Sequence, residues 1–178
     1  MRWIITPGTL LLLAAVVSDA PLARPAAPQK KEYLSETEAT KIRDAGTTGP
    51  RIVLYAAFAA DRIKKLQYEF AHMDPADQKR TERLNNLINA YTGCIDDAAD
   101  LVDIGIEKQQ DIRDGVKALQ AQIKDALPYL QDLAVKGPER ETYKDNLDDA
   151  IEATQDAAKD VDKAMKEMAP PPVRRKPS

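Results

Sequence analysis

The feature that most constrains this chain is the return of apolar side chains at alternating steps of three and four residues. One such stripe consists of Ala56, Ala59, Ile63, Leu66, Phe70 and Met73. Similar stripes follow over residues 84–102, 112–133 and 143–168, and no segment shows sustained strand alternation. Steps of three and four average about 3.5 residues, which favours coiled-coil-like packing between neighbouring helices. We therefore predict an all-α fold, an elongated antiparallel helical bundle of about four long helices plus one short N-terminal helix.

Residues 1–18 are predicted to be a signal peptide. Arg2 supplies the positive charge, and the uncharged, mostly apolar stretch from Trp3 to Val17 forms the hydrophobic region. This stretch is shorter than the roughly 20 residues that an α-helix needs to span a bilayer. We therefore favour cleavage after Ser18, or nearby, over a permanent membrane anchor. The mature protein is expected to be secreted or periplasmic.

Charge and cysteine content narrow the function classes further. Cleavage after Ser18 removes Arg2, which leaves 25 Lys and Arg residues against 29 Asp and Glu residues, a formal charge of −4. Nucleic acids are bound through clustered cations, so we expect no nucleic-acid partner. Cys94 is the only cysteine, so no internal disulfide can form. Its position on an apolar stripe favours a buried, inert thiol over an exposed one that forms an intermolecular disulfide.

Proline and glycine mark the boundaries along the rest of the chain. Residues 19–34 are predicted to be a Pro/Ala-rich linker, residues 35–168 the helical bundle domain, and residues 169–178 a Pro-rich basic tail. Ser35 and Glu38 form a capping-box pattern that starts the short first helix, and Gly46 closes it. The following long helices are predicted to begin at Gly49-Pro50, Asp74-Pro75 and Gly137-Pro138, the last with Glu139 and Glu141 in its first turn.

Two interpretations stay open for residues 75–136. Gly105 as a C′ residue and Asp111 as an N-cap would place a turn near residues 105–111, but the periodicity also fits one continuous helix. Pro128 lies inside the following stripe, where we predict a kink without a break. Residues 141–168 contain few large apolar side chains, so we predict that this helix is the least firmly docked of the long helices.

Two groups of polar residues are weak candidates for a metal site. Glu69 and His72 have the E-x-x-H spacing of di-iron bundles, but such a site uses two of these segments and His72 is the only histidine. The acidic run around Asp96 and Asp100 offers oxygen ligands, yet it lacks the glycine turn of an EF-hand loop. We favour a surface histidine near a helix end and a solvated acidic face, and we expect no cofactor.

An uninterrupted apolar run from Ile52 to Ala60 is the strongest indication of an interface. A one-sided stripe would place polar residues at about half of these positions. Either the short first helix covers the second face through Leu34, Ala39 and Ile42, or a partner protein does, and we favour the first. The interface candidates are Val53, Leu54, Ala57 and Phe58.

Motifs for catalysis are sparse in this sequence. It has no glycine-rich phosphate loop, paired histidines or cysteine cluster, and its one histidine lies far from Cys94 in sequence. We therefore expect an exported, non-enzymatic protein with an interaction or structural role in the cell envelope or secreted space, contacting a protein partner or itself through helical faces. An extracytoplasmic chaperone or adaptor and a metal-binding helical bundle are the alternatives. Membrane contact is expected only from the signal peptide and, weakly, from the basic tail.

Overall fold

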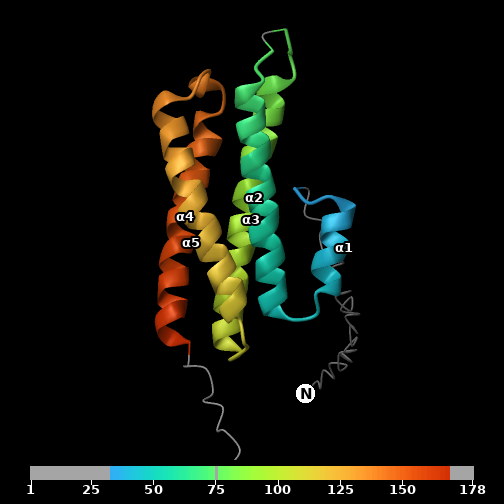
Figure 1. The fold of residues 1–178 in the computed structure, drawn as a ribbon, viewed down its shortest axis with the longest axis vertical. Helices are drawn as coiled ribbons and strands as arrows, with labels where there is room; N and C mark the ends of the chain where they lie inside the picture. Colours follow the sequence, from blue (N-terminus) through green and yellow to red (C-terminus); the bar gives the residue numbers. More distant parts are fainter. Residues whose placement is uncertain (1–32, 75, 169–178) are drawn as a thin grey trace, which may run out of the picture. The chain divides into compact units, whose positions relative to one another are not determined.

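The computed structural model describes residues 33–74 and 76–168 (Figure 1). The predicted signal peptide, the basic tail and residues 19–32 of the linker lie outside the described residues. The helices are α1 (Glu36–Asp44), α2 (Thr48–Ala71), α3 (Arg80–Glu107), α4 (Arg113–Lys136), the 3-10 helix η1 (Arg140–Thr142) and α5 (Lys144–Glu167). These helices pack against one another, and the described part of the chain has no strand, so the predicted all-α bundle is confirmed.

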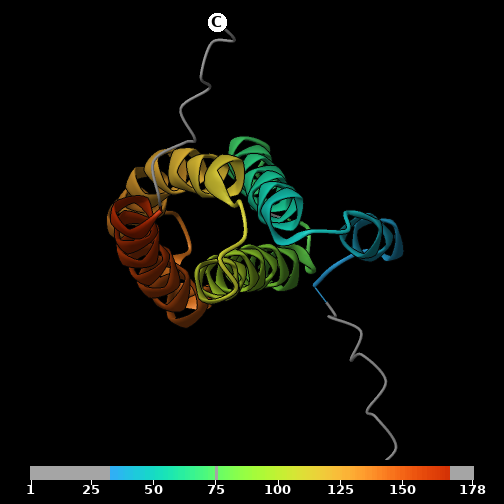
Figure 2. The same cartoon turned by 90° about the horizontal axis from the view of Figure 1, so that it is seen from below.

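Four long helices surround one apolar core, and α1 lies outside them against α2. Each long helix packs on two others, in the cyclic order α2, α3, α5, α4 (Figure 2). Consecutive long helices run in opposite directions, as predicted (Figure 1). However, α3 and α4 lie diagonally across the bundle although they follow each other in sequence. Neighbouring helices α2 and α4 therefore run parallel, as do α3 and α5.

Glycine permits the close approaches that this arrangement requires. A Cβ at Gly115 in α4 would lie 2.8 Å from the carbonyl oxygen of Gly49 and from Cβ of Ile52, so α2 and α4 touch where both helices begin. Gly105 lies inside α3, and a side chain there would collide with Ile112. Gly105 is thus a packing residue rather than the predicted C′ residue.

The connection between α3 and α4 settles the two interpretations of residues 75–136. They form two helices, joined by residues 108–112. Gln109 adopts a positive φ of 51°, and the amide of Gln110 donates to the carbonyl of Gly105 (2.8 Å), which is the Schellman pattern of helix ends. The N-cap of α4 is Ile112 instead of Asp111. The predicted turn is therefore present, but its capping residues differ from those predicted.

Two predicted helix starts are also displaced along the chain. After Asp74, α3 begins only at Arg80, because the Asp74 carboxylate accepts from the amide of Ala76 (2.9 Å) in a local turn. After Gly137, the chain makes the short helix η1 before α5 begins at Lys144. Glu139 does not lie in the first turn of α5 but adopts a left-handed conformation, with φ of 57°.

Three further local predictions are confirmed: the capping of α1, the unbroken helix at Pro128 and the burial of Cys94. Ser35 and Glu38 form the capping box of α1, and Gly46 follows that helix with φ of 70°. Helix α4 continues through Pro128. Cys94 is fully buried in the core.

Candidate interaction surface

Helix α1 is held on the outside of the bundle by a few specific contacts. Its capping box places the Glu38 carboxylate at the start of the helix, where it accepts from the amide of Ser35 (2.9 Å). The same carboxylate faces α2. There it meets the guanidinium of Arg62, with Oε1 at 2.6 Å from Nη1 and Oε2 at 2.7 Å from Nη2. The pair is bidentate, which is the strongest geometry for an arginine and a carboxylate.

The ion pair between Glu38 and Arg62 is largely shielded from water. The Arg62 side chain is 8% exposed and the Glu38 side chain 15%. Arg62 also donates to the carboxylate of Asp61 (2.9 Å) and to the carbonyl of Tyr33 (3.3 Å). The hydrogen bond from Arg62 lowers the pKa of Glu38 from 4.5 to about 2, and the Glu38 carboxylate raises the pKa of Arg62. The pair is therefore fully charged at neutral pH.

The residues just before α1 complete its attachment. The Tyr33 hydroxyl donates to the carboxylate of Asp97 on α3. The Tyr33 ring lies directly against the α3 backbone, because a Cβ at Gly93 would be 2.8 Å from that ring. Leu34 is buried and belongs to the apolar core of the bundle. We call Arg62, Gly93 and Asp97, which contact residues 33–38, the α1-docking face.

The interface candidates divide between covered and exposed positions. Phe58 is buried at 8% exposure, on the side of α2 that includes Arg62. Leu54 is partly buried, whereas Val53 and Ala57 are exposed. Val53 and Leu54 line an open groove of about 510 Å³ next to Asp111 and Asp114. Leu34 is buried, and Ala39 and Ile42 pack against the apolar core, as the internal-cover hypothesis predicts, while Val53 and Ala57 stay accessible.

Glu69 and His72 do not converge on a common point. Glu69 forms an ion pair with Arg83 (3.0 Å), which also pairs with Asp77. His72 is exposed at the C-cap of α2, where its ring stacks on Tyr68 at 4.1 Å between centroids. Its Nδ1 lies 3.0 Å from the Tyr68 carbonyl oxygen. Both side chains thus have local protein partners instead of facing each other.

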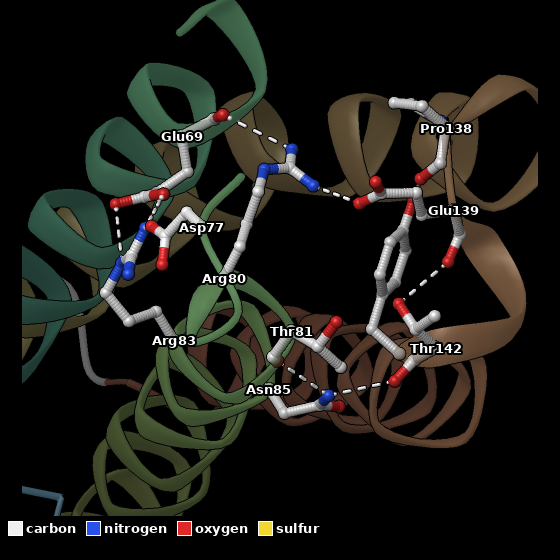
Figure 3. A network of polar contacts seen from close by, with 10 residues as sticks. Glu69, Asp77, Arg80, Thr81, Arg83, Asn85, Pro138, Glu139 and Thr142 are labelled. Carbon is white, nitrogen blue, oxygen red and sulfur yellow. Dashed lines mark hydrogen bonds and ion pairs between the residues drawn. The ribbon is translucent and has the colours of Figure 1, made fainter. Parts of the chain in front are cut away.

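A polar network around Arg80 joins the loops at this end of the bundle (Figure 3). The Arg80 side chain is only 6% exposed, pairs with Glu139, and donates to the backbone carbonyl of Glu69 (3.3 Å). Its guanidinium also lies over the Phe70 ring, 5.3 Å from the centroid. Asn85 donates to the carbonyl of Thr142 (2.9 Å). These contacts fix the α2–α3 loop to the α4–α5 loop, which is a structural role.

The acidic run on α3 lies on the solvent side of the bundle. The side chains of Asp96 and Asp100 are accessible to solvent. The surrounding protein still removes part of the water around the Asp96 carboxylate, and this desolvation, together with the charge of Asp100, raises the pKa of Asp96. Asp103 similarly adds to the rise in pKa of Asp160 on α5, after the larger effect of burial. Within residues 33–74 and 76–168, no three His, Cys, Asp or Glu side chains are grouped so that they could hold a metal ion.

Sequence reasoning missed the residues that dock α1. Arg62 was not among the candidate residues, and Asp97 belongs to the acidic run that was interpreted as a solvated face. One signal was present, because Arg62 follows Phe58 by four residues and so continues the second apolar face of α2. An arginine on an apolar face needs a carboxylate partner. Glu38 was a candidate for that partner, because the capping box holds its carboxylate at the start of α1.

Comparisons with known proteins add no family to this description. Neither protein-family models, nor curated protein sequences, nor solved structures gave a match to the chain. In the described part of the chain, no helix combines the length and apolar character needed to cross a membrane.

Proposed function

We propose that this protein is an exported, non-enzymatic helical bundle that contacts a protein partner, or another copy of itself, through its helical faces. The observation that supports this function is the docking of α1 on the outside of the bundle. The α1-docking face combines the nearly buried guanidinium of Arg62 with the backbone of α3 at Gly93. The segment that docks on it supplies a buried leucine, Leu34, just before α1 and a carboxylate, Glu38, within α1. Contact between a helix and a groove is a common mode of protein recognition.

The exposed apolar residues beside this face support the same function. Val53 is 38% exposed on α2, and Ala57 lies one turn further along the same helix. Both lie outside the area that α1 covers. They therefore offer a surface on which a partner can pack without first displacing α1.

Site-specific photo-crosslinking in the native host tests this proposal. A photoreactive residue replaces Val53 in one variant and Val135 in the control, since Val135 is also an exposed apolar residue, at 75%, but lies on α4. We expect the Val53 variant to give a discrete adduct of defined mass that the Val135 variant does not give. Identical adduct patterns from both variants would argue against a specific interface on α2.

Export is tested separately by N-terminal sequencing of the protein recovered outside the cytoplasm. The proposal expects a mature chain that begins near Asp19. Recovery of the full chain from the cytosol alone would remove the exported part of the proposal.

A further inference from the structure

The geometry of α1 points to its exchange between two copies of this chain. We infer that the partner for the α1-docking face is α1 of a second copy, so that two chains form a dimer by swapping this helix. The inference rests on the proposed function, and it concerns self-contact through the α1-docking face rather than the exposed surface around Val53. It starts from the observation that α1 is separate from the core. The four long helices pack in a closed cycle, and α1 lies against α2 outside that cycle.

The contacts that hold α1 are few and local in sequence. They come from Tyr33, Leu34 and Glu38 near its start, and from Ala39 and Ile42, which pack against the apolar core. Helix α1 itself contains no buried residue. A second copy carries the same side chains in the same order, and therefore offers Arg62 the same acceptors and Asp97 the same hydroxyl donor. Exchange of an identical element keeps every docking contact, which makes it a low-cost route to a dimer.

The connector between α1 and α2 is built as a hinge. It consists of Ala45, Gly46 and Thr47. Gly46 has a positive φ of 70°, and no atom lies within 4 Å of the position that a Cβ would take there. Glycine adopts other backbone conformations without steric cost, so the hinge can open. Pro50 lacks the amide that would bond to the Gly46 carbonyl, which disfavours a merger of α1 and α2 into one continuous helix.

A reversal of the Glu38–Arg62 charges tests the exchange directly. In E38R the docking partners are both positive, and in R62E both are negative, so neither chain can close on itself. A dimer of one E38R chain with one R62E chain contains two complementary pairs, one natural and one reversed. We expect each variant alone to be monomeric, with fast amide exchange in α1, and the equimolar mixture to form a dimer with slow exchange in α1.

Light scattering and hydrogen exchange provide the readouts. The concentration series should reach about 1 mM, because a short linker gives the competing intramolecular contact an effective concentration in that range. A mixture that stays monomeric, with α1 exchanging as fast as in the separate chains, overturns the exchange. The double variant E38R/R62E is the control, since it restores a complementary pair within one chain and should regain slow α1 exchange at low concentration.

A hinge variant tests the same inference with the natural ion pair intact. In G46V a β-branched residue occupies the position with positive φ, which disfavours the closed hinge. We expect a larger dimer fraction than for the wild-type chain at equal concentration. If G46V forms no more dimer than the wild-type chain, the hinge role of Gly46 is overturned; if the charge mixture also stays monomeric throughout the series, exchange itself is excluded. If a Val53-specific crosslink to a different protein persists in that case, the proposed function stands and only self-exchange fails.

Discussion

Replacement of Glu38 with glutamine measures how firmly α1 is docked. The folded-state pKa of Glu38 is about 2, against an ordinary value of 4.5. One pKa unit corresponds to about 1.4 kcal/mol, so interactions of the charged carboxylate stabilise docking by about 3 kcal/mol. Most of this comes from Arg62, and a smaller part from the capping box with Ser35. Glutamine keeps the shape but removes the charge, and it leaves a nearly buried guanidinium without its bidentate partner.

The loss is expected to be local. Helix α1 has nine residues, and isolated helices shorter than about 12 residues are marginal in water, so undocked α1 unravels. A loss of about 3 kcal/mol raises the population of the open state by roughly 150-fold. Hydrogen exchange of the amides in residues 39–45 should accelerate by up to that factor, while amides in the core of α3 keep their rates.

A matched control separates the ion pair from the helix dipole. Glu36 is exposed in the same first turn of α1, so E36Q removes the same formal charge from the helix start. We expect E36Q to accelerate exchange only a few-fold, since a charge at a helix terminus contributes about 0.3–1 kcal/mol. Equal acceleration in E36Q and E38Q would refute the role assigned to Arg62. Loss of protection throughout the bundle in E38Q would refute the separation of α1 from the core.

The same docking should weaken in acid. A carboxylate with a lowered folded-state pKa contributes its full stabilisation above its unfolded pKa and loses it as the pH falls through the folded pKa. For Glu38 this window runs from about 4.5 down to about 2. We expect α1 exchange, corrected for intrinsic rates, to rise across this window in the wild-type chain. The rise should be much smaller in E38Q, which has no carboxylate to protonate at that position.

The other expectations concern the core. Tyr91→Phe removes the buried hydroxyl that lies 2.8 Å from Thr154 Oγ1, and should lower the free energy of unfolding by about 1 kcal/mol in urea titrations. Gly115→Ala forces a methyl group against the α2 backbone and should cost about 1–3 kcal/mol; no loss of stability would contradict the close α2–α4 contact. Cys94 is buried and should react with a thiol reagent only after denaturation. Helix α5 buries only Leu147, Val161 and smaller side chains, and slower amide exchange in α5 than in α3 would contradict its weaker docking.

Local signals in the sequence located most helices but not all of their ends. The capping box at Ser35 and Gly46 define α1 closely, because both act through atoms within a few residues. Asp74 was expected to cap α3, but it closes a local turn instead. Helix α3 starts where Arg80 reaches Glu139 in the α4–α5 loop. The first residue of that helix therefore contacts a partner 59 residues away, which a local pattern does not report.

In the candidate site, too, the sequence predicted the apolar burial but not the polar contacts between distant residues. The apolar run over residues 52–60 marked a second buried face on α2, and Phe58 is indeed buried there. The sequence did not predict the pairing of Arg62 with Glu38 or of Tyr33 with Asp97. Charged and hydroxyl groups are usually solvated, so their presence in a sequence does not indicate a protein partner. Glu69 and His72 have the spacing of a metal-binding pair on one helix. In the structure, however, Glu69 pairs with Arg83, and His72 Nδ1 lies against the Tyr68 carbonyl.

Periodicity alone therefore established the helical class, the positions of the long helices and the residues that face the core, since burial of apolar surface repeats with the helical turn. The order of helices around the core required the folded chain. Either diagonal or adjacent placement of α3 and α4 would bury the same stripes. The choice depends on close approaches such as Gly115 of α4 against Gly49 of α2, which are 66 residues apart in the sequence. The placement of α1 is of the same kind, because it depends on one arginine meeting one carboxylate across 24 residues of chain.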